Sequence, residues 1–524
     1  MKCEALLNSL KKIFTMSKNY FCILFLLIPV FAKAQITYTE NVASIIYNKC
    51  SSCHHEGGIA PLQFTSYAEV KKNVGMITLA ALDPKSKFMP PWMPDTKYSH
   101  FLDERVLTEK EMESIKTWIA EGMIQGPIAA EPELPKFPKN SQLGKPDLTV
   151  SMTESFLHKG DNNDEYRIFI LPTNLKEGHN VSAIEIVPGN PKIAHHIILG
   201  LDTTQFADNL DAKDEGYGYS QYGGFGFYPT YYNWSGWVPG NTTRFFPDGI
   251  SNYVLPNSKV LLQMHYGPTP IDTKDSTTIN IFYSKTPVDR FLKGWVISPN
   301  DIKDGPFFIK ANTTHTFHAE YKVTSDYSLI NVTPHAHWLG KKWEVFAVHT
   351  NGDTTNLIKI NDWDFNWQNF FSFKKFVKLE KGTIIYCNVT YDNTEKNFRN
   401  PNRPIKNVAW GESAKDEMFL FYFAYVDYKQ GDENIEIGGS MNSFDAIYNP
   451  EKKCVNLFYN LAENTDVAIK MCDEKNKAVQ FIQNKESEKG KHGTLFNTAT
   501  LKHGTYWCKI STANYTESKK VVIN

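Results

Sequence analysis

The pattern of residues 147–430 limits the fold more than any other feature, because short apolar and aromatic runs alternate there with Gly, Pro, Asn and Asp. Examples of such runs are Tyr166–Leu171, Ile184–Val187, Lys259–Tyr266, Ser328–Val332 and Phe419–Val426. Short runs of this composition, bounded by turn residues, are typical of strands in β-sandwiches. The length of the segment suits two such domains. We therefore expect one β-sandwich at residues 147–290 and a second at residues 291–449.

Composition and charge exclude other classes of protein. The chain has 524 residues, which is enough for three or four domains. Lys and Arg number 56 and Asp and Glu 57, so no basic surface indicates nucleic-acid binding. Aromatic residues make up 14 % of the chain, which favours strands and sandwich cores. The composition predicts a multidomain, mainly β protein that does not bind nucleic acid.

An apolar run at residues 21–31 indicates a secretory signal peptide. The run follows a start that contains several lysines, and Ala32-Lys33-Ala34 comes directly after it. A basic start, a short apolar core and an A-x-A end predict that residues 1–34 are removed before Gln35. The run is also shorter than the roughly 20 residues with which a helix spans a bilayer. We expect an exported protein without a stable membrane span.

The sequence Cys50-Ser51-Ser52-Cys53-His54 is the attachment pattern of c-type haem. The two thiols can form thioethers with the haem vinyl groups, and the histidine then lies against one face of the iron. A zinc site would require a second pair of ligands, and the nearest later cysteine is Cys387. The motif therefore predicts a covalently bound haem c held by Cys50, Cys53 and His54.

The residues around this motif indicate a small all-α domain at residues 35–126. Thr108-Glu109-Lys110-Glu111 is a capping box that precedes apolar residues at helical spacing. With the haem motif, this segment resembles a class I cytochrome c. The resemblance implies a soft thioether as the sixth iron ligand. We expect Met89 in this role, with Met93 and Met76 as alternatives. The proline-rich residues 127–146 predict a semi-rigid linker.

Five histidines lie on strand-like segments of the central region, namely His195, His196, His265, His335 and His337. The spacing of His335 and His337 would place both rings on the same face of a strand, which suits a shared metal ion. Imidazole ligands suit copper, zinc or iron. A blue-copper site would need a cysteine beside these histidines, and the sequence has none near them. The residues alone leave the metal open.

The central region resembles the copper type II, ascorbate-dependent monooxygenases, a family that includes peptidylglycine α-hydroxylating monooxygenase and dopamine β-monooxygenase. The motifs that carry the resemblance are Ala194-His195-His196, Gln263-Met264-His265-Tyr266-Gly267, His335-Ala336-His337-Trp338-Leu339-Gly340-Lys341 and Asp416-Glu417-Met418. Residues 361–368 and Tyr391-Asp392-Asn393 are similar to bacterial relatives. The resemblance implies two jelly-roll-like β-sandwiches, each holding one mononuclear copper ion. It also implies a reaction that inserts one oxygen atom of O2 into a C–H bond and consumes two electrons.

The resemblance assigns three ligands to each copper ion. His195, His196 and His265 would hold an electron-transfer copper, and His335, His337 and Met418 an oxygen-binding, catalytic copper. Three imidazoles accept both Cu(I) and Cu(II), whereas a thioether favours Cu(I), the form that reacts with O2. Three protein ligands also leave a position open for oxygen, as a catalytic site requires.

Two departures from the family pattern concern the substrate. Thr333 stands where the peptide-hydroxylating enzyme has an arginine that binds the substrate carboxylate, and Leu420 replaces an asparagine, whereas Tyr422 is retained. A hydroxyl group cannot replace the bidentate guanidinium in binding an anion. Of the three candidate substrate-side residues Thr333, Leu420 and Tyr422, the two replacements therefore argue against a peptide substrate. We expect a small organic molecule instead.

Residues 450–524 predict a small C-terminal β-sandwich. Leu501–Tyr506 and the ending Lys-Lys-Val-Val-Ile resemble the C-terminal sorting domain of type IX secretion. This resemblance implies the secretion machinery of a Gram-negative bacterium as a partner, with a periplasmic stage and then a place at the cell surface or outside the cell. A carbohydrate-binding or spacer module is the alternative. One disulfide is possible among Cys454, Cys472 and Cys508.

Together these features predict an exported copper monooxygenase that receives electrons through its fused haem domain. O2, a small-molecule substrate and an external electron donor, either an ascorbate-like reductant or another redox protein, would be its partners. The alternative is an extracellular haem and copper protein that transfers electrons or binds copper without hydroxylase activity. A further possibility keeps the enzyme but makes the haem domain a redox sensor.

Overall fold

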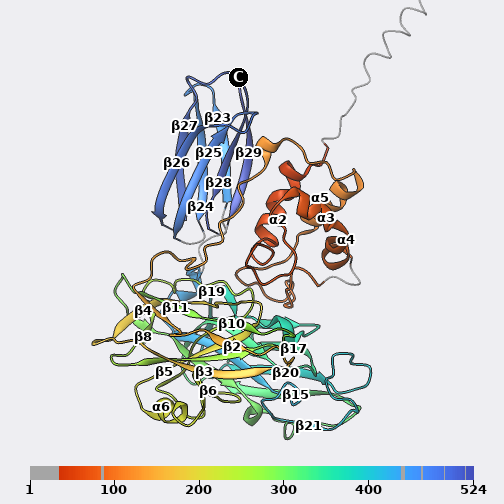
Figure 1. The fold of residues 1–524 in the computed structure, drawn as a ribbon, viewed down its shortest axis with the longest axis vertical. Helices are drawn as coiled ribbons and strands as arrows, with labels where there is room; N and C mark the ends of the chain where they lie inside the picture. Colours follow the sequence, from red (N-terminus) through yellow and green to blue (C-terminus); the bar gives the residue numbers. More distant parts are fainter. Residues whose placement is uncertain (1–34, 84–87, 438–442, 462–463, 489, 514) are drawn as a thin grey trace, which may run out of the picture.

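The computed structural model describes residues 35–83, 88–437, 443–461, 464–488, 490–513 and 515–524. The predicted signal peptide at residues 1–34 lies outside the described residues. Within them, no helix is long and apolar enough to cross a membrane. The chain forms a helical N-terminal module, two central β-sandwiches and a C-terminal β-sandwich (Figure 1). The predicted mainly β architecture is confirmed.

The N-terminal module is helical around one apolar cluster. Its α-helices are α2 (Ala43–Lys49), α3 (Tyr67–Lys72), α4 (Val74–Ile77) and α5 (Glu109–Ala120), with π-helical turns at Tyr38–Val42 and Thr78–Leu82. Helix α5 begins at the predicted capping box, in which Thr108 and Glu111 bond each other's backbone. Its Trp118 packs against Tyr38, with ring centres 5.8 Å apart. The π-helical turn at Tyr38–Val42 and the last helix of the module therefore pack together.

The first central β-sandwich has two facing five-stranded sheets, in the orders β1-β11-β4-β8-β12 and β6-β3-β9-β5-β7, with a smaller β2-β10 ribbon. The elements are β1 (Leu148–Ser151), β2 (Phe156–His158), β3 (Glu165–Pro172), β4 (His179–Val187), β5 (Ala194–Asp202), α6 (Phe206–Asp211), β6 (Tyr219–Ser220), β7 (Tyr231–Trp237), β8 (Ile250–Val254), β9 (Lys259–Tyr266), β10 (Thr273–Asp275), β11 (Thr278–Tyr283) and β12 (Arg290–Phe291). One apolar core fills the space between the two large sheets.

The second central β-sandwich has two facing four-stranded sheets, in the orders β13-β22-β16-β19 and β15-β20-β17-β18. The strands are β13 (Lys293–Ile297), β14 (Phe308–Ile309), β15 (Thr314–Lys322), β16 (Tyr327–His335), β17 (Gly340–Val348), β18 (Thr354–Ile360), β19 (Phe371–Leu379), β20 (Ile384–Asp392), β21 (Val408–Ala409) and β22 (Leu420–Asp427). Alternating apolar residues of both sheets form its core, which includes the fully buried Trp343.

The C-terminal β-sandwich packs the sheet β23-β24-β27 against the sheet β26-β25-β28-β29. Its strands are β23 (Ser443–Asn449), β24 (Cys454–Leu461), β25 (Thr465–Cys472), β26 (Ala478–Ser487), β27 (Gly490–Asn497), β28 (Gly504–Ser511) and β29 (Thr516–Ile523). Because β23 pairs with β24, this sandwich begins before the expected boundary at residue 450. Cys454, Cys472 and Cys508 are free thiols, so the possible disulfide among them is not formed.

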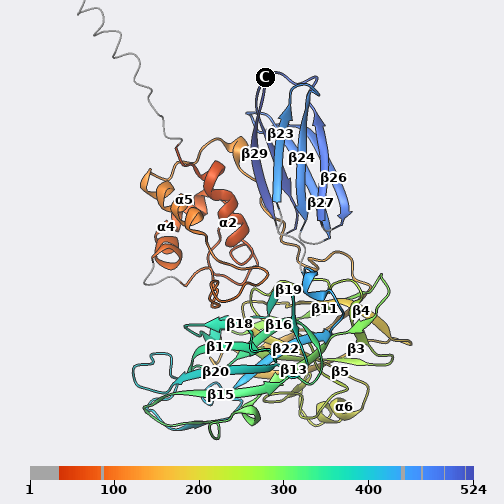
Figure 2. The same ribbon diagram turned by 180° about the vertical axis from the view of Figure 1, so that it is seen from behind.

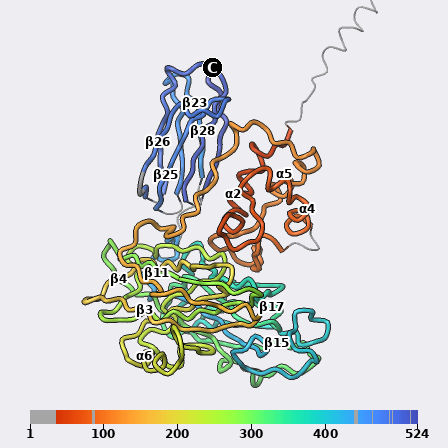
Figure 3. The backbone as a smooth tube through the Cα atoms, viewed as in Figure 1, coloured from red at the N-terminus to blue at the C-terminus, as the bar shows by residue number. Residues whose placement is uncertain are grey.

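The helical module and the C-terminal sandwich lie side by side at one end of the molecule, and the two central sandwiches form the other end (Figures 1 and 2). The Asn48 side chain on α2 bonds both backbone groups of Thr516 on the edge strand β29. Residues 127–146 run between these parts, as the tube in Figure 3 shows. This linker packs Ala129 and Ala130 against Trp507.

Candidate metal centres

His195, His196 and His265 come together in the first central sandwich. The Nδ1 atom of His196 lies 3.2 Å from Nδ1 of His195 and 3.3 Å from Nδ1 of His265. One ligand atom from each residue lies within 4.8 Å of those of the other two. We call this cluster site 1. Three nitrogen atoms that converge in this way can hold one metal ion.

A β-bulge allows two consecutive histidines to serve the same site. Neighbouring residues of a regular strand point to opposite faces of the sheet. In the pairing of β5 with β9, Ala194 lies opposite Tyr266 and His196 opposite His265, and the register shifts between them. His195 is therefore the extra residue of the bulge. A bulge redirects side chains, and here both imidazoles reach His265.

Asp164 orients His265 from the side away from the cluster. Its Oδ1 lies 2.8 Å from Nε2 of His265 and accepts a hydrogen bond from that nitrogen. With the proton on Nε2, Nδ1 of His265 is free to bind a metal ion, as is common in carboxylate–histidine–metal arrangements. The Tyr166 ring stacks on His265 with ring centres 4.0 Å apart. Sequence reasoning missed Asp164, which lies just before β3 and belongs to no recognisable motif.

The site 1 histidines are neutral at physiological pH. Burial lowers the pKa of His195 to about 4. Burial, together with repulsion from neighbouring histidines, lowers the pKa values of His196 and His265 well below the ordinary value. Neutral imidazole is the form that binds metal ions. Site 1 therefore presents its nitrogen atoms ready for a metal ion, without a competing proton.

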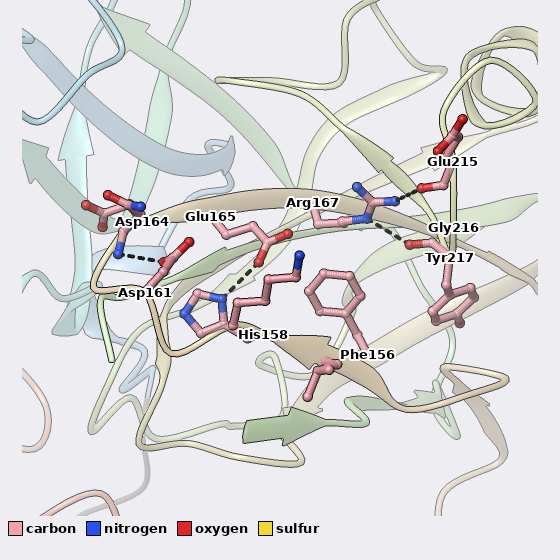
Figure 4. Close-up of a pocket in the computed structure, with 12 residues that line it drawn as sticks. Phe156, His158, Asp161, Asp164, Glu165, Arg167, Glu215, Gly216 and Tyr217 are labelled. Carbon is pink, nitrogen blue, oxygen red and sulfur yellow. Dashed lines mark hydrogen bonds and ion pairs between the residues drawn. The ribbon is translucent and has the colours of Figure 1, made fainter. Parts of the chain in front are cut away.

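A polar pocket of about 430 Å³ includes Asp164 in its lining (Figure 4). His158 and Glu165 form an ion pair there, with Nδ1 and Oε2 2.9 Å apart. Arg167 closes another part of the lining by donating to the backbone carbonyls of Glu215 and Tyr217. The pocket thus reaches the carboxylate that orients His265.

His335, His337 and Met418 come together in the second central sandwich. The Met418 sulfur lies 3.2 Å from Nε2 of His335. The rings of His335 and His337 have centres 5.4 Å apart and are almost perpendicular, at 87°. We call this cluster site 2. Its donors are two imidazoles and one thioether, and all three residues are largely buried.

His337 reaches site 2 by a different route from the one its spacing predicts. The prediction that both histidines project from one strand is wrong, because β16 ends at His335 and His337 lies in the following turn. The buried Glu417 holds this turn. Its carboxylate accepts hydrogen bonds from the backbone nitrogens of His337, Leu339 and Met418, the last two at 2.9 Å. Glu417 therefore ties together the two segments that carry the ligands.

The second ring nitrogens of the site 2 histidines are also bonded. Nδ1 of His335 bonds the Gln368 side-chain oxygen, and Nδ1 of His337 lies 3.2 Å from the carbonyl oxygen of Asp416. With both Nδ1 atoms donating, the Nε2 atoms are free for a metal ion. Burial lowers the pKa of His335 below its ordinary value and that of His337 to about 3. Both rings are therefore neutral.

The candidate substrate-side residues lie beside site 2 on one face of a sheet. Thr333 lies opposite Tyr422 and His335 opposite Leu420 in the pairing of β16 with β22. Cross-strand partners project to the same face, and so do residues two apart on one strand. Among the described residues, the buried Thr333 hydroxyl has no hydrogen-bond partner. Thr333 and Leu420 thus lie close to His335 on this face of the sheet.

The haem-attachment residues lie at the C-terminal end of α2. Cys50 and Cys53 are free thiols, and burial raises the pKa of both. Nδ1 of His54 donates to the Leu62 carbonyl oxygen at 2.9 Å, so Nε2 is free to bind a metal ion. Met89 packs in the same apolar cluster as Cys50.

Met76 and Met93, the alternatives to Met89, are less suited to be the predicted sixth ligand of a haem iron. Met76 is 51 % exposed, and the sulfur of Met93 accepts a hydrogen bond from the Asp364 backbone nitrogen at 3.1 Å. Close to Cys53 of the motif, the buried Nε donor of Arg105 lacks a partner among the described residues. A haem carries two propionate carboxylates that can accept from such donors. The module therefore fits a haem group.

Two family models match this chain. Residues 309–445 match the model described as copper type II ascorbate-dependent monooxygenase, C-terminal domain. Residues 446–524 match the model described as secretion system C-terminal sorting domain. The chain therefore contains a domain of the copper monooxygenase family, which includes all of site 2, and a sorting domain that indicates export to the cell surface or beyond.

Comparisons over the whole chain add little. No curated protein matches it. Among solved structures, a β-glucuronidase of Ruminococcus gnavus has 10 % identity and a TM-score of 0.12, covering 41 % of this chain and 36 % of that one. The β-glucuronidase of Dictyoglomus thermophilum has 11 % identity and a TM-score of 0.14, covering 46 % and 45 %. The chain spans less than half of each enzyme, and these scores carry no structural argument.

Proposed function

We propose that this chain is an exported copper-dependent monooxygenase that hydroxylates a C–H bond of a small organic molecule. The reaction consumes O2, two electrons and two protons, inserts one oxygen atom into the substrate and releases the other as water. The observation that carries the proposal is the presence, in one chain, of two buried donor clusters with different donors. The copper monooxygenase match over residues 309–445 supports it.

Site 1 is proposed to bind the electron-transfer copper. Its three neutral imidazoles suit both Cu(I) and Cu(II), so the ligands need not change when an electron arrives or leaves. Asp164 keeps the proton on Nε2 of His265 and fixes the ring. The paired strands β5 and β9 hold the three rings in place.

Site 2 is proposed to bind the catalytic copper. Copper held there would supply the chemistry that activates O2, and the three protein donors leave a position open for it. The sulfur of Met418 favours Cu(I). Thr333, Leu420 and Tyr422 would face the substrate from the same side of the sheet as His335. None of them carries a positive charge, which favours a substrate without a carboxylate at this position.

The N-terminal module is proposed to bind haem c and to supply the electrons. Cys50 and Cys53 would form the two thioethers, His54 would bind the iron from one side, and Met89 from the other. An ascorbate-like reductant or another redox protein would serve as the external donor. Covalent fusion favours this supply, because a short linker gives an effective concentration in the millimolar range.

Oxygen uptake with a library of small organic substrates tests the proposed function. The copper- and haem-loaded chain should consume O2 and release a hydroxylated product, and Met418→Leu should abolish both. Copper binding without substrate-dependent oxygen uptake would instead favour the alternative, an electron-transfer or copper-binding protein.

The His54→Ala variant distinguishes a haem module that supplies electrons from one that acts as a redox sensor. If the module supplies electrons, this variant should lose turnover driven by a redox-protein donor but retain turnover with ascorbate, whereas equal loss with both donors would contradict the relay.

A further inference from the structure

One short segment of the second sandwich contacts both metal sites. It comprises residues 363–368, between β18 and β19, and we call it the junction segment. The Phe365 ring lies 5.1 Å from the His195 ring of site 1 and 5.3 Å from the His337 ring of site 2. The His195 and His337 rings therefore both contact the Phe365 ring, although the two histidines belong to different sandwiches.

The junction segment also bonds the site 2 histidines from behind. Trp363 Nε1 donates to the carbonyl oxygen of His337 at 3.2 Å, and the Gln368 side chain bonds Nδ1 of His335. Arg399 donates to the carbonyl oxygen of Trp363 at 2.7 Å. Both Trp363 and Phe365 are buried. The Phe365 ring therefore has a fixed position between the sites.

The N-terminal module reaches the same segment through residues 92–105, which we call the strap. Backbone bonds join the strap to the second sandwich at two places: Asp95 donates to Lys359, and Leu102 donates to Ser372, each at 2.8 Å. Two residues before Asp95, the sulfur of Met93 accepts a hydrogen bond from the backbone nitrogen of Asp364. Asp364 directly precedes Phe365, so the strap contacts the residue next to the shared ring.

The aromatic packing of the strap strengthens this attachment. Trp92 packs edge-on against Phe371, with ring centres 5.5 Å apart, and Phe101 lies 5.2 Å from Phe373. Phe101 is fully buried, so the strap is part of the core of the second sandwich. The position of Met93 relative to Phe365 is therefore set by packing and does not depend on a chance encounter of two domains.

We propose that the contact of Met93 with Asp364, the residue that precedes Phe365, is the place where electrons pass from the N-terminal module to site 1. The inference rests on the proposed function. In each transfer, the ferrous iron of a haem attached through Cys50 and Cys53 and bound by His54 would lose one electron, and Cu(II) at site 1 would gain it as Cu(I). No bond forms or breaks and no proton moves. The path from the strap consists of one hydrogen bond, one peptide link and one ring contact.

The test follows single electron transfers without turnover. Flash photoreduction places one electron on the haem of the oxidised, copper-loaded chain, and the decay of the ferrous absorption band reports its departure. The copper-free chain gives the blank. Phe365→Leu removes the shared ring but retains apolar bulk, and Met93→Leu removes the sulfur at nearly constant volume.

Matched controls lie away from the junction segment. Phe346→Leu removes a ring that stacks on Tyr386 elsewhere in the same sandwich. Met76→Leu changes an exposed methionine of the N-terminal module. Copper content and the Cu(II) resonance spectrum are measured for every variant, so that loss of a metal ion is not mistaken for a slow transfer. Phe365→Tyr serves as a second variant in case Phe365→Leu does not retain copper.

We expect the copper-dependent decay to slow severalfold in Phe365→Leu, to slow less in Met93→Leu, and to remain unchanged in both controls. A copper-dependent decay with the same rate in all variants that retain both metals would overturn this inference and leave the proposed function intact. A wild-type chain that takes up no haem, or whose haem decay does not depend on copper, would overturn the proposed electron supply and the inference with it.

Discussion

Site 1 and site 2 are both built from three donors, but their supports differ. Site 1 lies on two paired strands, and the backbone ladder of β5 and β9 sets the positions of its rings. Site 2 lies where β16 ends, and a turn and a loop supply His337 and Met418. The positions of His337 and Met418 therefore depend on hydrogen bonds made by Glu417 and by the Tyr391 hydroxyl, which donates to the Met418 carbonyl oxygen.

This difference corresponds to the different tasks proposed for the two sites. A site that only exchanges electrons is best served by fixed ligands, and three imidazoles on a sheet provide them. A site that must admit O2 and a substrate needs an open side, and loops provide it at the expense of rigidity. Buried hydrogen bonds restore part of that rigidity around His337 and Met418.

The largest effect is expected from Glu417→Ala, which would break site 2 but leave site 1 intact. The change leaves backbone N–H groups of His337, Leu339 and Met418 without their acceptor in the protein interior. Each buried unsatisfied donor costs about 1–3 kcal/mol, so the free energy of unfolding should fall by at least about 3 kcal/mol. Denaturant unfolding and copper analysis provide the measurements.

In that experiment the copper content should fall from two ions to one per chain. Glu436→Ala, which removes an exposed carboxylate of the same sandwich, is the control and should change neither quantity. Retention of both copper ions by Glu417→Ala would show that site 2 does not depend on this carboxylate.

A smaller effect, confined to site 1, is expected from Asp164→Asn. The amide can no longer hold the proton on Nε2 of His265 as a carboxylate does. Loss of such an outer partner typically lowers metal affinity by about 10–100-fold. A competition titration with a copper chelator measures the affinity of each site. Asp161→Asn, in the same loop and pocket, is the matched control, and an equal loss in both variants would exclude a specific role for Asp164.

The smallest effect is expected from Tyr391→Phe, which tests the support of Met418. The Tyr391 hydroxyl donates to the carbonyl oxygen of Met418 at 2.7 Å, and both groups are buried. Removal of the hydroxyl should lower the free energy of unfolding by about 1 kcal/mol, as for a typical buried hydrogen bond. Tyr386→Phe on the same strand provides the comparison. An equal fall in the free energy of unfolding of Tyr386→Phe would mean that the hydrogen bond to Met418 makes no particular contribution to stability.

The sequence predicted the strands and the residues that cluster at sites 1 and 2, but not how their side chains come together. Strand-like runs such as Lys259–Tyr266 match the observed strand because alternation and turn residues are local signals. The bulge at His195 depends on the register between β5 and β9, which sequence periodicity does not determine. The position of His337 beyond the end of β16 depends on Glu417, which is distant in sequence.

The residues that orient the ligands were the least predictable. Asp164 carries no motif, and its role depends on the approach of β9 to the loop before β3. The segment at residues 361–368 was noticed through its resemblance to bacterial relatives, yet no property of Phe365 or Gln368 indicated contact with the histidines. These contacts arise from tertiary packing, within the second sandwich for His335 and His337 and between the sandwiches for His195, which no local sequence pattern determines.

The most direct test of two separate copper sites is a count of copper ions per chain, made together with Cu(II) resonance spectra. The full chain should bind two copper ions with non-blue spectra. His196→Ala and His335→Ala should each bind one copper ion, and the Cu(II) spectra of these two variants should differ from each other. The double variant should bind none. A wild-type chain that binds one copper ion or none, or single variants that leave the same spectrum, would contradict the account.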